Sequence, residues 1–492
     1  MGCEVNGVSA EEMSLSEDLL QQLFRASNFS NLRDALESLI AASRIHDGRA
    51  DLASKGILPT VVKLIQSISY PSGHEYLILC LKLIRNLCAG EISNQNLFLE
   101  LDGAGMISVV LRSAGLVSEP DYGIIRVGLQ VLANVCLAGE KHQKLIWHCF
   151  FPSEFVAVAE VQSRDTFDPL CMIIYTCCDG NPSLVLELCG EQGLPIVTEI
   201  VRTASVVGFR EDWLKLLLSR ICLEEIHFPI LFTRLYCVGD SENSERIAFS
   251  AEQAYLLSIV SEILNERLSD ITVSNDFALF VFGIFKRSLE VIQSHSRGKS
   301  SLPTGSAAVD VLGYSLTILR DTCAQHGKTA TTEDLVDVVD TLVLHGFIEL
   351  LLSVLSKLEP PAIIKRAMRE NENQEPCSSE SSKPCPYRGF RRDIVAVIGN
   401  CTFLRKNVQD EIRKRNGVLL LLQQCVIDEE NPFLREWGIW CVRNLLEGNV
   451  ENQNVVAELE LQKSVEVPEL AGIGLRVDVD PKTRRARLVN MS

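Results

Sequence analysis

Residues 441–454 read CVRNLLEGNVENQN, and residues 83–96 read LIRNLCAGEISNQN. In both stretches an apolar segment ends in an Asn, a polar break follows, and a Gln comes nine residues after the Asn. The chain holds four copies of this pattern, and their residues are Asn86 with Gln95, Asn134 with Gln143, Asn400 with Gln409, and Asn444 with Gln453. Agreement at so many points indicates an internal repeat.

The distance between copies indicates the kind of repeat. The marker Asn residues lie 48 residues apart in the N-terminal pair and 44 apart in the C-terminal pair. Helical repeats of roughly 40–47 residues are typical of armadillo and HEAT proteins. Apolar residues also recur at three- and four-residue spacing along most of the chain, which is the period of helices. We therefore predict an all-α fold, an armadillo/HEAT-like α-solenoid that forms a right-handed superhelix of helical repeats.

Each repeat also has a predictable internal order. Three dipeptides precede long helices, and they are Tyr70-Pro71, Glu119-Pro120 and Asn431-Pro432. Proline suits the first turn of a helix, where its missing N–H is not required, and Asn431 is a good N-cap residue. Asn416-Gly417 precedes a run of apolar residues, which predicts a turn and then a buried helix. A repeat is thus expected to contain a short helix, an apolar helix and a long helix.

The composition of the chain limits its partners and its location. The 492 residues carry a net charge of -17, which disfavours binding to the phosphate backbone of nucleic acids. The 17 cysteines have no regular spacing, and many lie in apolar helical segments, so we interpret them as small buried residues in a reducing compartment. The longest clean apolar stretch, residues 277–285, is far shorter than the ~20 residues of a membrane-spanning helix. We expect a cytoplasmic protein without a membrane span.

Breaks in the helical periodicity divide the chain into seven predicted segments. These are N-terminal helices at 1–50, armadillo-like repeats at 51–293 that become degenerate after about 166, a flexible loop at 294–306, helical repeats at 307–367, a disordered polar loop at 368–392, C-terminal repeats at 393–464 and a tail at 465–492. In the tail, the alternation of Leu475 to Val479 predicts a short extended segment or a hairpin.

A specific combination of residues lies between Arg391 and about Ser464. Its members are Asn400, Gln409, Asn416-Gly417, Asp428, Asn431-Pro432-Phe433, Glu436-Trp437, Arg443-Asn444-Leu445 and Asn452-Gln453. This combination resembles the conserved C-terminal region of ataxin-10 proteins. The resemblance implies a cytoplasmic armadillo-repeat scaffold of the ataxin-10 type without enzymatic activity, prone to self-association and linked to cell division or development.

The marker residues are also the candidate site. In cargo-binding armadillo proteins a Trp lies four residues before the Asn, on the same helix face, and the pair holds an extended peptide. Here Trp440 and Asn444 have that spacing, whereas the matching positions before the other Asn residues hold Lys82, Gln130 and Ala396. The candidate partner-binding residues are Asn86, Asn134, Asn400, Trp437, Trp440, Arg443 and Asn444.

Each candidate has a structural alternative. The Asn residues either line a peptide groove or end their helices and satisfy free carbonyl groups. Trp437 and Trp440 either pack in the core or form an interface hot spot. The sequence alone favours the structural role for the Asn residues and core packing for the Trp residues.

Three functions remain open at this stage. We predict a non-catalytic scaffold that binds proteins. One form of this hypothesis is that the bound protein is a second copy of the chain, which would give a homo-oligomer. The alternative is a peptide-groove adaptor or transport protein of the importin type. An enzyme is the weakest hypothesis, because the His326–Thr329 sequence HGKT has Thr322 where a phosphate-binding loop requires its first Gly. We predict no catalytic residue, no cofactor and no metal site.

Overall fold

The computed structural model describes residues 29–225, 227–236, 249–267, 269–292, 300–325, 337–371, 383–459, 475–479 and 486–490. Its internal contacts divide the chain into two compact units, residues 1–240 with 250–263 and residues 241–249 with 264–492. Apart from one strand pair, the described elements are helices. The predicted all-α armadillo class is therefore confirmed.

From α3 to α11, helices of the first unit follow one another in triplets of two shorter helices and one long helix. After α2 (Phe29–Ala42), the first triplet is α3 (His46–Ser54), α4 (Ile57–Ser67) and α5 (His74–Leu87). The remaining elements are α6 (Ile92–Glu100), α7 (Gly103–Val110) with the π-helical turn η2 (Leu111–Gly115), α8 (Tyr122–Cys136), α9 (Glu140–Phe150), α10 (Ser153–Ala159), α11 (Arg164–Cys178), α12 (Pro182–Cys189), α13 (Leu194–Val207), α14 (Asp212–Ser219) with η3 (Arg220–Glu224), α15 (Phe228–Arg234) and α16 (Ala251–Glu266).

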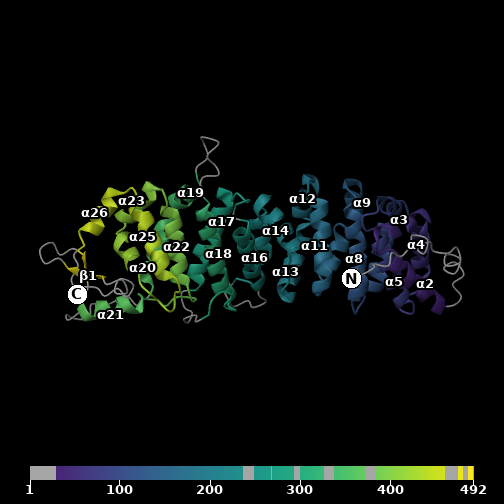
Figure 1. Ribbon diagram of the computed structural model, residues 1–492, viewed down its shortest axis with the longest axis horizontal. Helices are drawn as coiled ribbons and strands as arrows, with labels where there is room; N and C mark the ends of the chain where they lie inside the picture. The colour runs from purple at the N-terminus through teal and green to yellow at the C-terminus, as the bar shows by residue number, and fades with distance from the viewer. Residues whose placement is uncertain are drawn as a thin grey trace, which may run out of the picture. The chain divides into compact units, whose positions relative to one another are not determined.

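The long helices of the first unit are the centre of its core. In Figure 1, α5, α8 and α11 lie side by side in chain order, and each packs on the next. α8 is buried on most of its circumference, and Ile125, Val131 and Val135 are fully inaccessible to solvent. A helix that is apolar on so many sides must lie between neighbours. The repeats are thus stabilised mainly by burial between consecutive long helices.

The second unit repeats the same arrangement. Its helices are α17 (Asn275–Val291), α18 (Ala307–Ala324), α19 (Val338–Leu344), α20 (Phe347–Lys357), α21 (Ala362–Asn371), α22 (Phe390–Thr402), α23 (Lys406–Lys414), α24 (Gly417–Leu422), α25 (Leu434–Leu446) and α26 (Val450–Ala457). α18, α22 and α25 pack in succession (Figure 1). The described helices α23, α24 and α25 give one repeat in the predicted order of short, apolar and long helix.

The C-terminal tail contains the predicted hairpin. β1 (Leu475–Val479) and β2 (Ala486–Asn490) pair in antiparallel orientation, with Leu475 opposite Asn490. The alternation that predicted this pairing is confirmed. The residues expected to form the turn, 480–482, lie outside the described residues.

Two details of the long helices differ from the sequence prediction. α5, α8 and α25 begin after their prolines and not at them. Asn431 does not cap α25, because its Oδ1 accepts from the backbone N–H of Arg391 at 3.0 Å and its Nδ2 donates to Asp428 Oδ2 at 2.9 Å. The N-cap position is held by Phe433, with a φ of 65°. Asn431 therefore joins the start of α22 to the loop before α25.

The polar segment 368–392 is more ordered than its composition predicts. Residues 368–371 continue α21, and Lys383 forms a parallel bridge with Leu358. Tyr387 is buried and donates from its hydroxyl to Asp393 Oδ2 at 2.9 Å. Single large side chains thus anchor parts of a segment that lacks periodicity, and residues 372–382 lie outside the description. Disorder of the loop stays a prediction.

The later part of the predicted loop 294–306 is likewise held in place. The buried carboxylate of Asp310 accepts from the Thr304 hydroxyl at 2.8 Å and from the Gly305 backbone N–H at 3.3 Å. An aspartate one turn into α18 thus fixes the chain that enters the helix. Residues 293–299 lie outside the description, and flexibility of the loop stays a prediction.

The described cysteines are free, and most are buried as predicted. Cys80, Cys136, Cys401 and Cys441 have no accessible surface. Burial raises the pKa of the Cys80 thiol to about 12, because the thiolate loses its hydration. Thiols in such an environment are poor nucleophiles.

A thiol titration therefore tests the packing of the core. At pH 8, a disulfide reagent should modify Cys80, Cys401 and Cys441 only after the protein has been unfolded in guanidinium, with the modified residues identified by mass spectrometry. The denatured chain, in which every thiol is accessible, provides the control. Rapid modification of these three residues in the native protein would contradict the packing described here.

Candidate partner-binding site

The marker Asn residues connect consecutive long helices. Asn134 on α8 donates from Nδ2 to the carbonyl oxygen of Arg85 on α5 at 2.8 Å. Asn444 on α25 makes the same bond to Gly399 on α22 at 2.9 Å, and Asn400 makes it to Arg320 on α18 at 3.0 Å. In the first two cases the acceptor is the residue just before the marker Asn of the preceding repeat. Each Asn therefore satisfies a carbonyl group of its neighbour.

Asn86 occupies the same position without a marker Asn before it. Its Nδ2 donates to the Ser43 hydroxyl at 3.1 Å and reaches the Ile40 carbonyl at 3.5 Å. Its Oδ1 accepts from the Arg85 guanidinium at 2.9 Å. In the first copy of the motif, Asn86 therefore contacts the end of α2 and the turn after it, where the other marker Asn residues donate to the preceding long helix.

The marker Gln residues satisfy the carbonyl groups at the ends of the long helices. Each donates from Nε2 to the residue seven positions earlier, and the pairs are Gln95 with Cys88 at 3.0 Å, Gln143 with Cys136 at 3.3 Å, Gln409 with Thr402 at 3.4 Å and Gln453 with Leu446 at 2.8 Å. The last carbonyl groups of a helix have no partner within it. The nine-residue offset from Asn to Gln is therefore the geometry of a helix end.

Two of these glutamines also reach the next repeat. Gln95 donates to the carbonyl of Asn134 at 2.9 Å, and Gln409 donates to the carbonyl of Asn444 at 2.8 Å. Within each pair of copies, Asn and Gln side chains thus bond in opposite directions across the same interface. We call these eight marker residues the amide ladder.

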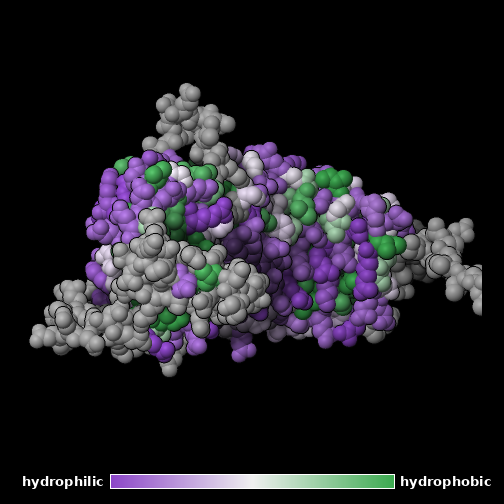
Figure 2. All heavy atoms as spheres, turned by 60° about the vertical axis from the view of Figure 1, so that its left-hand side comes forward, coloured by the Kyte–Doolittle hydropathy of each residue, from purple (hydrophilic) through white to green (hydrophobic). Residues whose placement is uncertain are grey.

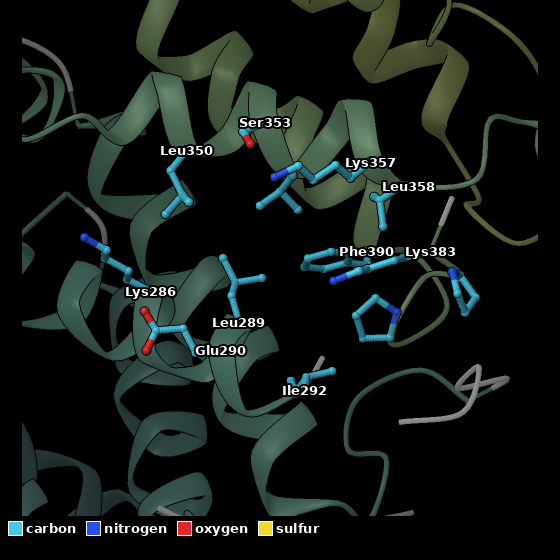
Figure 3. Close-up of a pocket in the computed structure, with 13 residues that line it drawn as sticks. Lys286, Leu289, Glu290, Ile292, Leu350, Ser353, Lys357, Leu358, Lys383 and Phe390 are labelled. Carbon is cyan, nitrogen blue, oxygen red and sulfur yellow. The ribbon is translucent and has the colours of Figure 1, made fainter. Parts of the chain in front are cut away.

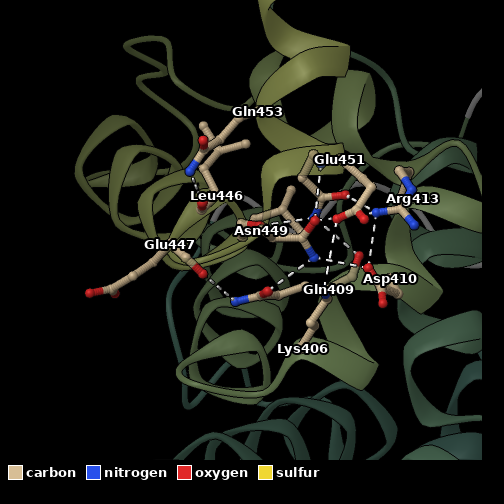
Figure 4. Close-up of polar contacts among 11 residues, drawn as sticks. Lys406, Gln409, Asp410, Arg413, Leu446, Glu447, Asn449, Glu451 and Gln453 are labelled. Carbon is tan, nitrogen blue, oxygen red and sulfur yellow. Dashed lines mark hydrogen bonds and ion pairs between the residues drawn. The ribbon is translucent and has the colours of Figure 1, made fainter.

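A polar network surrounds the C-terminal part of the amide ladder (Figure 4). Asn449 caps α26, with its Oδ1 accepting from the Asn452 backbone N–H at 3.1 Å, and donates to Asp410 Oδ1 at 2.9 Å. Arg413 also contacts Asp410 Oδ1, at 2.9 Å. The hydrogen bond from Asn449 and the bond from Arg413 lower the pKa of the Asp410 carboxyl. This network fixes α26 against α23.

The geometry assigns the Asn residues a structural role. Asn444 is 1% exposed, and its Nδ2 is already bonded, so a passing peptide would have to displace a bond within the protein. Asn86, Asn134 and Asn400 are half-buried and bonded in the same way. Binding of a partner by these Asn residues stays a prediction. A partner would have to compete with the interhelical hydrogen bonds for their amide groups.

Trp440 and Arg443 have a different environment. Trp440 is 43% exposed, and the Arg443 guanidinium lies over its ring at 5.1 Å, within the range of a cation–π contact. Trp437 is half-buried on the same helix. Trp440 and Asn444 have the spacing of a peptide-binding pair, but one faces solvent and the other does not. The structure brings Trp440 and Arg443 together and separates them from Asn444.

A pocket that the sequence does not reveal lies between α17, α20 and the segment before α22 (Figure 3). Its volume is about 280 Å³, its wall includes Leu289, Leu350 and Phe390, and Lys286, Lys357 and Lys383 are among the residues around it. These residues are separated by up to about a hundred positions in the chain, and no shared motif connects them. The long polar segment between α21 and α22 obscures the relation in the sequence.

Comparison with known proteins shows what the chain is similar to. The family model described as "Spinocerebellar ataxia type 10 protein domain" matches residues 390–488, and its name also refers to homo-association. Ataxin-10 from Bos taurus is 26% identical over 474 residues, which cover 90% of this chain and 92% of that protein. The chain is therefore similar to ataxin-10 over most of its length, and its C-terminal part matches the family model.

Other ataxin-10 relatives show the same similarity. Ataxin-10 from Homo sapiens is 24% identical over 412 residues, which cover 81% of this chain and 79% of that protein. The ataxin-10 homolog from Dictyostelium discoideum is 37% identical over 92 residues, or 19% of this chain and 15% of that protein. The resemblance predicted from the C-terminal motif is confirmed, and for the animal relatives the similarity extends over most of the chain.

Solved structures with similarity to the chain include helical repeat proteins. An engineered protein covers 88% of this chain and 99% of its own length, with 12% identity and a TM-score of 0.33. A designed armadillo repeat protein in complex with the peptide (KR)4 covers 50% of this chain and 99% of its own, with 15% identity and a TM-score of 0.30. The repeat assignment for this chain is established by its own helix triplets.

The described residues also bear on metal binding and on membrane spans. Within the described ranges, no group of three or more His, Cys, Asp and Glu side chains is arranged to hold a metal ion. In the same ranges no single helix is long and apolar enough to cross a membrane, and α19 with α20 meets the length and composition only jointly, across a 66° bend. Residues His326–Thr329 lie outside the described residues.

Removing one amide of the ladder should weaken the stacking of repeats. Asn444→Ala removes the Nδ2 donor from the Gly399 carbonyl, which keeps its bond from the Thr402 hydroxyl at 2.9 Å. The net loss of one such hydrogen bond costs about 0.5–1.5 kcal/mol. We expect the free energy of unfolding, measured by guanidinium titration, to fall by that amount.

The matched control is Asn86→Ala, whose side chain bonds at a half-buried position that water can reach. This variant should lose less stability than Asn444→Ala. Equal stability of Asn444→Ala and the unsubstituted protein would show that the interhelical bond is dispensable and would return Asn444 to the list of groove residues.

Proposed function

We propose that this relative of ataxin-10 is a non-catalytic scaffold that binds proteins, including a second copy of itself, through its C-terminal repeat. The observation that carries the proposal is a row of exposed side chains on and before α25. They are Phe433, Glu436, Ile439, Trp440 and Arg443, which we call the α25 stripe.

The composition of the α25 stripe resembles that of an interface. Phe433 is 68% exposed, Ile439 is 55% exposed and Trp440 is 43% exposed. Contiguous exposed apolar side chains usually mark interaction sites, and Trp and Arg are the residues most enriched in hot spots. The contact between Arg443 and Trp440 holds both side chains in a defined arrangement before any partner arrives.

The position of the stripe near the end of the repeats adds a second argument. Terminal repeats of a stacked protein usually present a polar outer surface, because no neighbour covers them. Here further apolar side chains of the last described helices and loops are exposed, and they are Leu404, Leu419, Ile427 and Val450. Figure 2 shows hydrophobic patches among hydrophilic residues on the face turned toward the viewer.

A second copy of the chain is the partner that we favour. The stripe lies within residues 390–488, which match the family model whose name refers to homo-association. The stripe also mixes Glu436 with Arg443, so a self-complementary contact is electrostatically possible when two stripes meet in opposite directions. Cytoplasmic location and a role in cell division or development belong to the same proposal through the family.

The importin-like alternative has less support. In the expected pair of Trp and Asn, only Trp440 remains available to a peptide. The amides of Asn444, Asn400 and Asn134 already donate to carbonyl groups within the protein. Trp440 therefore fits a protein interface better than a ladder along an extended peptide. An enzymatic function has no geometric support among the described residues, and the ataxin-10 family is not a known enzyme family.

Self-association should depend on Trp440. Sedimentation velocity of the full chain at 1–50 μM (about that range, where interfaces of standard size assemble) should show a dimer or larger species. Trp440→Asp places a carboxylate in the centre of the stripe and should shift the chain to monomer, a loss of at least about 2 kcal/mol of association free energy.

The matched control is Leu186→Asp, since Leu186 is 64% exposed on α12 and lies outside the stripe. This variant should associate like the unsubstituted chain. A monomer at every concentration, or equal dissociation of both variants, would contradict the proposed role of the stripe.

A further inference from the structure

The first repeats contain a cationic cleft in an otherwise acidic protein. It has a volume of about 380 Å³ and lies between the turn after α2, α3 and α5. Four of its eight lining residues are cations, and none carries a carboxylate; the cations are Arg44, Arg49, Lys82 and Arg85. The whole chain has a net charge of -17, so this concentration of positive charge runs against the composition.

These cations have no acidic partner among the described residues. Arg85 bonds only neutral amides, donating to Gln130 Oε1 at 3.0 Å and to Asn86 Oδ1 at 2.9 Å. Arg49 donates to the backbone carbonyls of Ser43 and Arg44 in the turn after α2, and its buried Nε has no hydrogen-bond partner among the described residues. A buried donor without a partner is rare in native proteins. The cleft therefore offers hydrogen-bond donors that the described residues leave unused.

The electrostatic environment of Arg85 supports the same conclusion. Burial lowers the pKa of its guanidinium, and the neighbouring charge of Arg126 lowers it further. Both effects oppose the charged state, and an anion in the cleft would relieve them. Structural ion pairs do the opposite, because they place the carboxylate beside the cation within the protein.

Lys82 gives the cleft its relation to the repeat. It lies four residues before Asn86, on the same face of α5, at the position that Trp440 holds relative to Asn444. In armadillo proteins that take basic peptides, a Trp at this position forms a wall around the incoming cation. A lysine here repels a basic peptide and attracts an acidic one.

We infer that the cleft at Arg44, Arg49, Lys82 and Arg85 binds an acidic segment of a partner protein, with Asp or Glu carboxylates accepting from these side chains. This binding site would be part of the scaffold function proposed above. It rests on that function in one respect, which is that the molecule bound in the cleft is a polypeptide. Guanidinium and carboxylate groups form charge-assisted hydrogen bonds, often in pairs, so a row of carboxylates is the matching chemistry.

Fluorescence anisotropy on the full chain tests the inference. The probe is a fluorescein-labelled peptide of six glutamates between glycines, and a hexalysine peptide is its counterpart. We expect the glutamate peptide to bind at low salt and to weaken as ionic strength rises toward about 0.3 M, since exposed charges are then screened. Hexalysine should not displace the glutamate peptide.

The variant pair separates the cleft from general charge. Arg44→Glu with Lys82→Glu should weaken the glutamate peptide at least about tenfold, because two attractive contacts become repulsive. Lys63→Glu with Lys141→Glu changes the net charge equally at exposed positions that do not line the cleft. Lys82→Met removes the charge of the side chain and keeps its apolar stem. It replaces the double variant if circular dichroism shows that the double variant is unstable. Lys82→Met should also weaken binding of the glutamate peptide.

Four results would overturn the inference. These are absence of binding at low salt, an equal loss in the control pair, no loss in Lys82→Met, and competition by millimolar inorganic phosphate as strong as that by unlabelled glutamate peptide, which would indicate a simple anion site. Self-association is measured separately, so a chain that dimerises but ignores the glutamate peptide would refute this inference alone.

Discussion

The structure depends on hydrogen bonds from buried amide side chains to backbone carbonyl groups at the ends of long helices. Every helix ends with carbonyl groups that have no partner within it, and a stack of helices buries many of these ends. Burying them unsatisfied would cost about 1–3 kcal/mol for each group. The amide ladder solves the problem locally through Gln95 and Gln409, and between repeats through Asn134 and Asn444. The same bonds fix the spacing between consecutive long helices.

This use of the amides decides which residues remain for partners. A peptide-binding armadillo surface needs Asn side chains that are free to bond a visiting backbone. Here Asn444 is buried and bonded to its neighbour, so the chemistry of the exposed surface is set by the residues beside it. Near Asn444 these are Trp440 and Arg443, which give an apolar surface with a cation. Near Asn86 they are Lys82 and Arg85, which give a positively charged cleft. One repeat motif thus carries two surfaces of different character.

The sequence predicted the class of fold because that information is local. Apolar periodicity and the spacing of the marker Asn residues both follow from the geometry of single helices and their ends. The order of short, apolar and long helices could be predicted from the Asn416-Gly417 turn and the proline-containing loop. The exposure of Trp440 could not be predicted, because it depends on which surfaces the neighbouring helices leave uncovered. Core packing was the simpler hypothesis for a Trp in an apolar helix.

Long-range contacts explain the failures. Asn431 looked like an N-cap because it precedes Pro432, but its side chain bonds Arg391, 40 positions away. Tyr387 lies in a stretch of polar residues, yet its burial against α22 orders the chain around it. Arg49 and Lys82 belong to different helices, and no spacing rule joins them. Such relations exist only after folding, so a single sequence does not show them.

Asn444 acts as a hydrogen-bond donor between repeats, and the substitution Asn444→Asp reverses that role. The substitution keeps the shape of the side chain but places a carboxylate against the Gly399 carbonyl, and an unpaired buried charge costs about 3–5 kcal/mol. In the folded state burial would raise the pKa of the new carboxyl. The stability deficit relative to the unsubstituted protein should therefore be large at pH 7.5 and should shrink as the pH falls and the carboxyl gains a proton to donate. A variant as stable as the unsubstituted protein at pH 7.5, or a deficit independent of pH, would contradict this account.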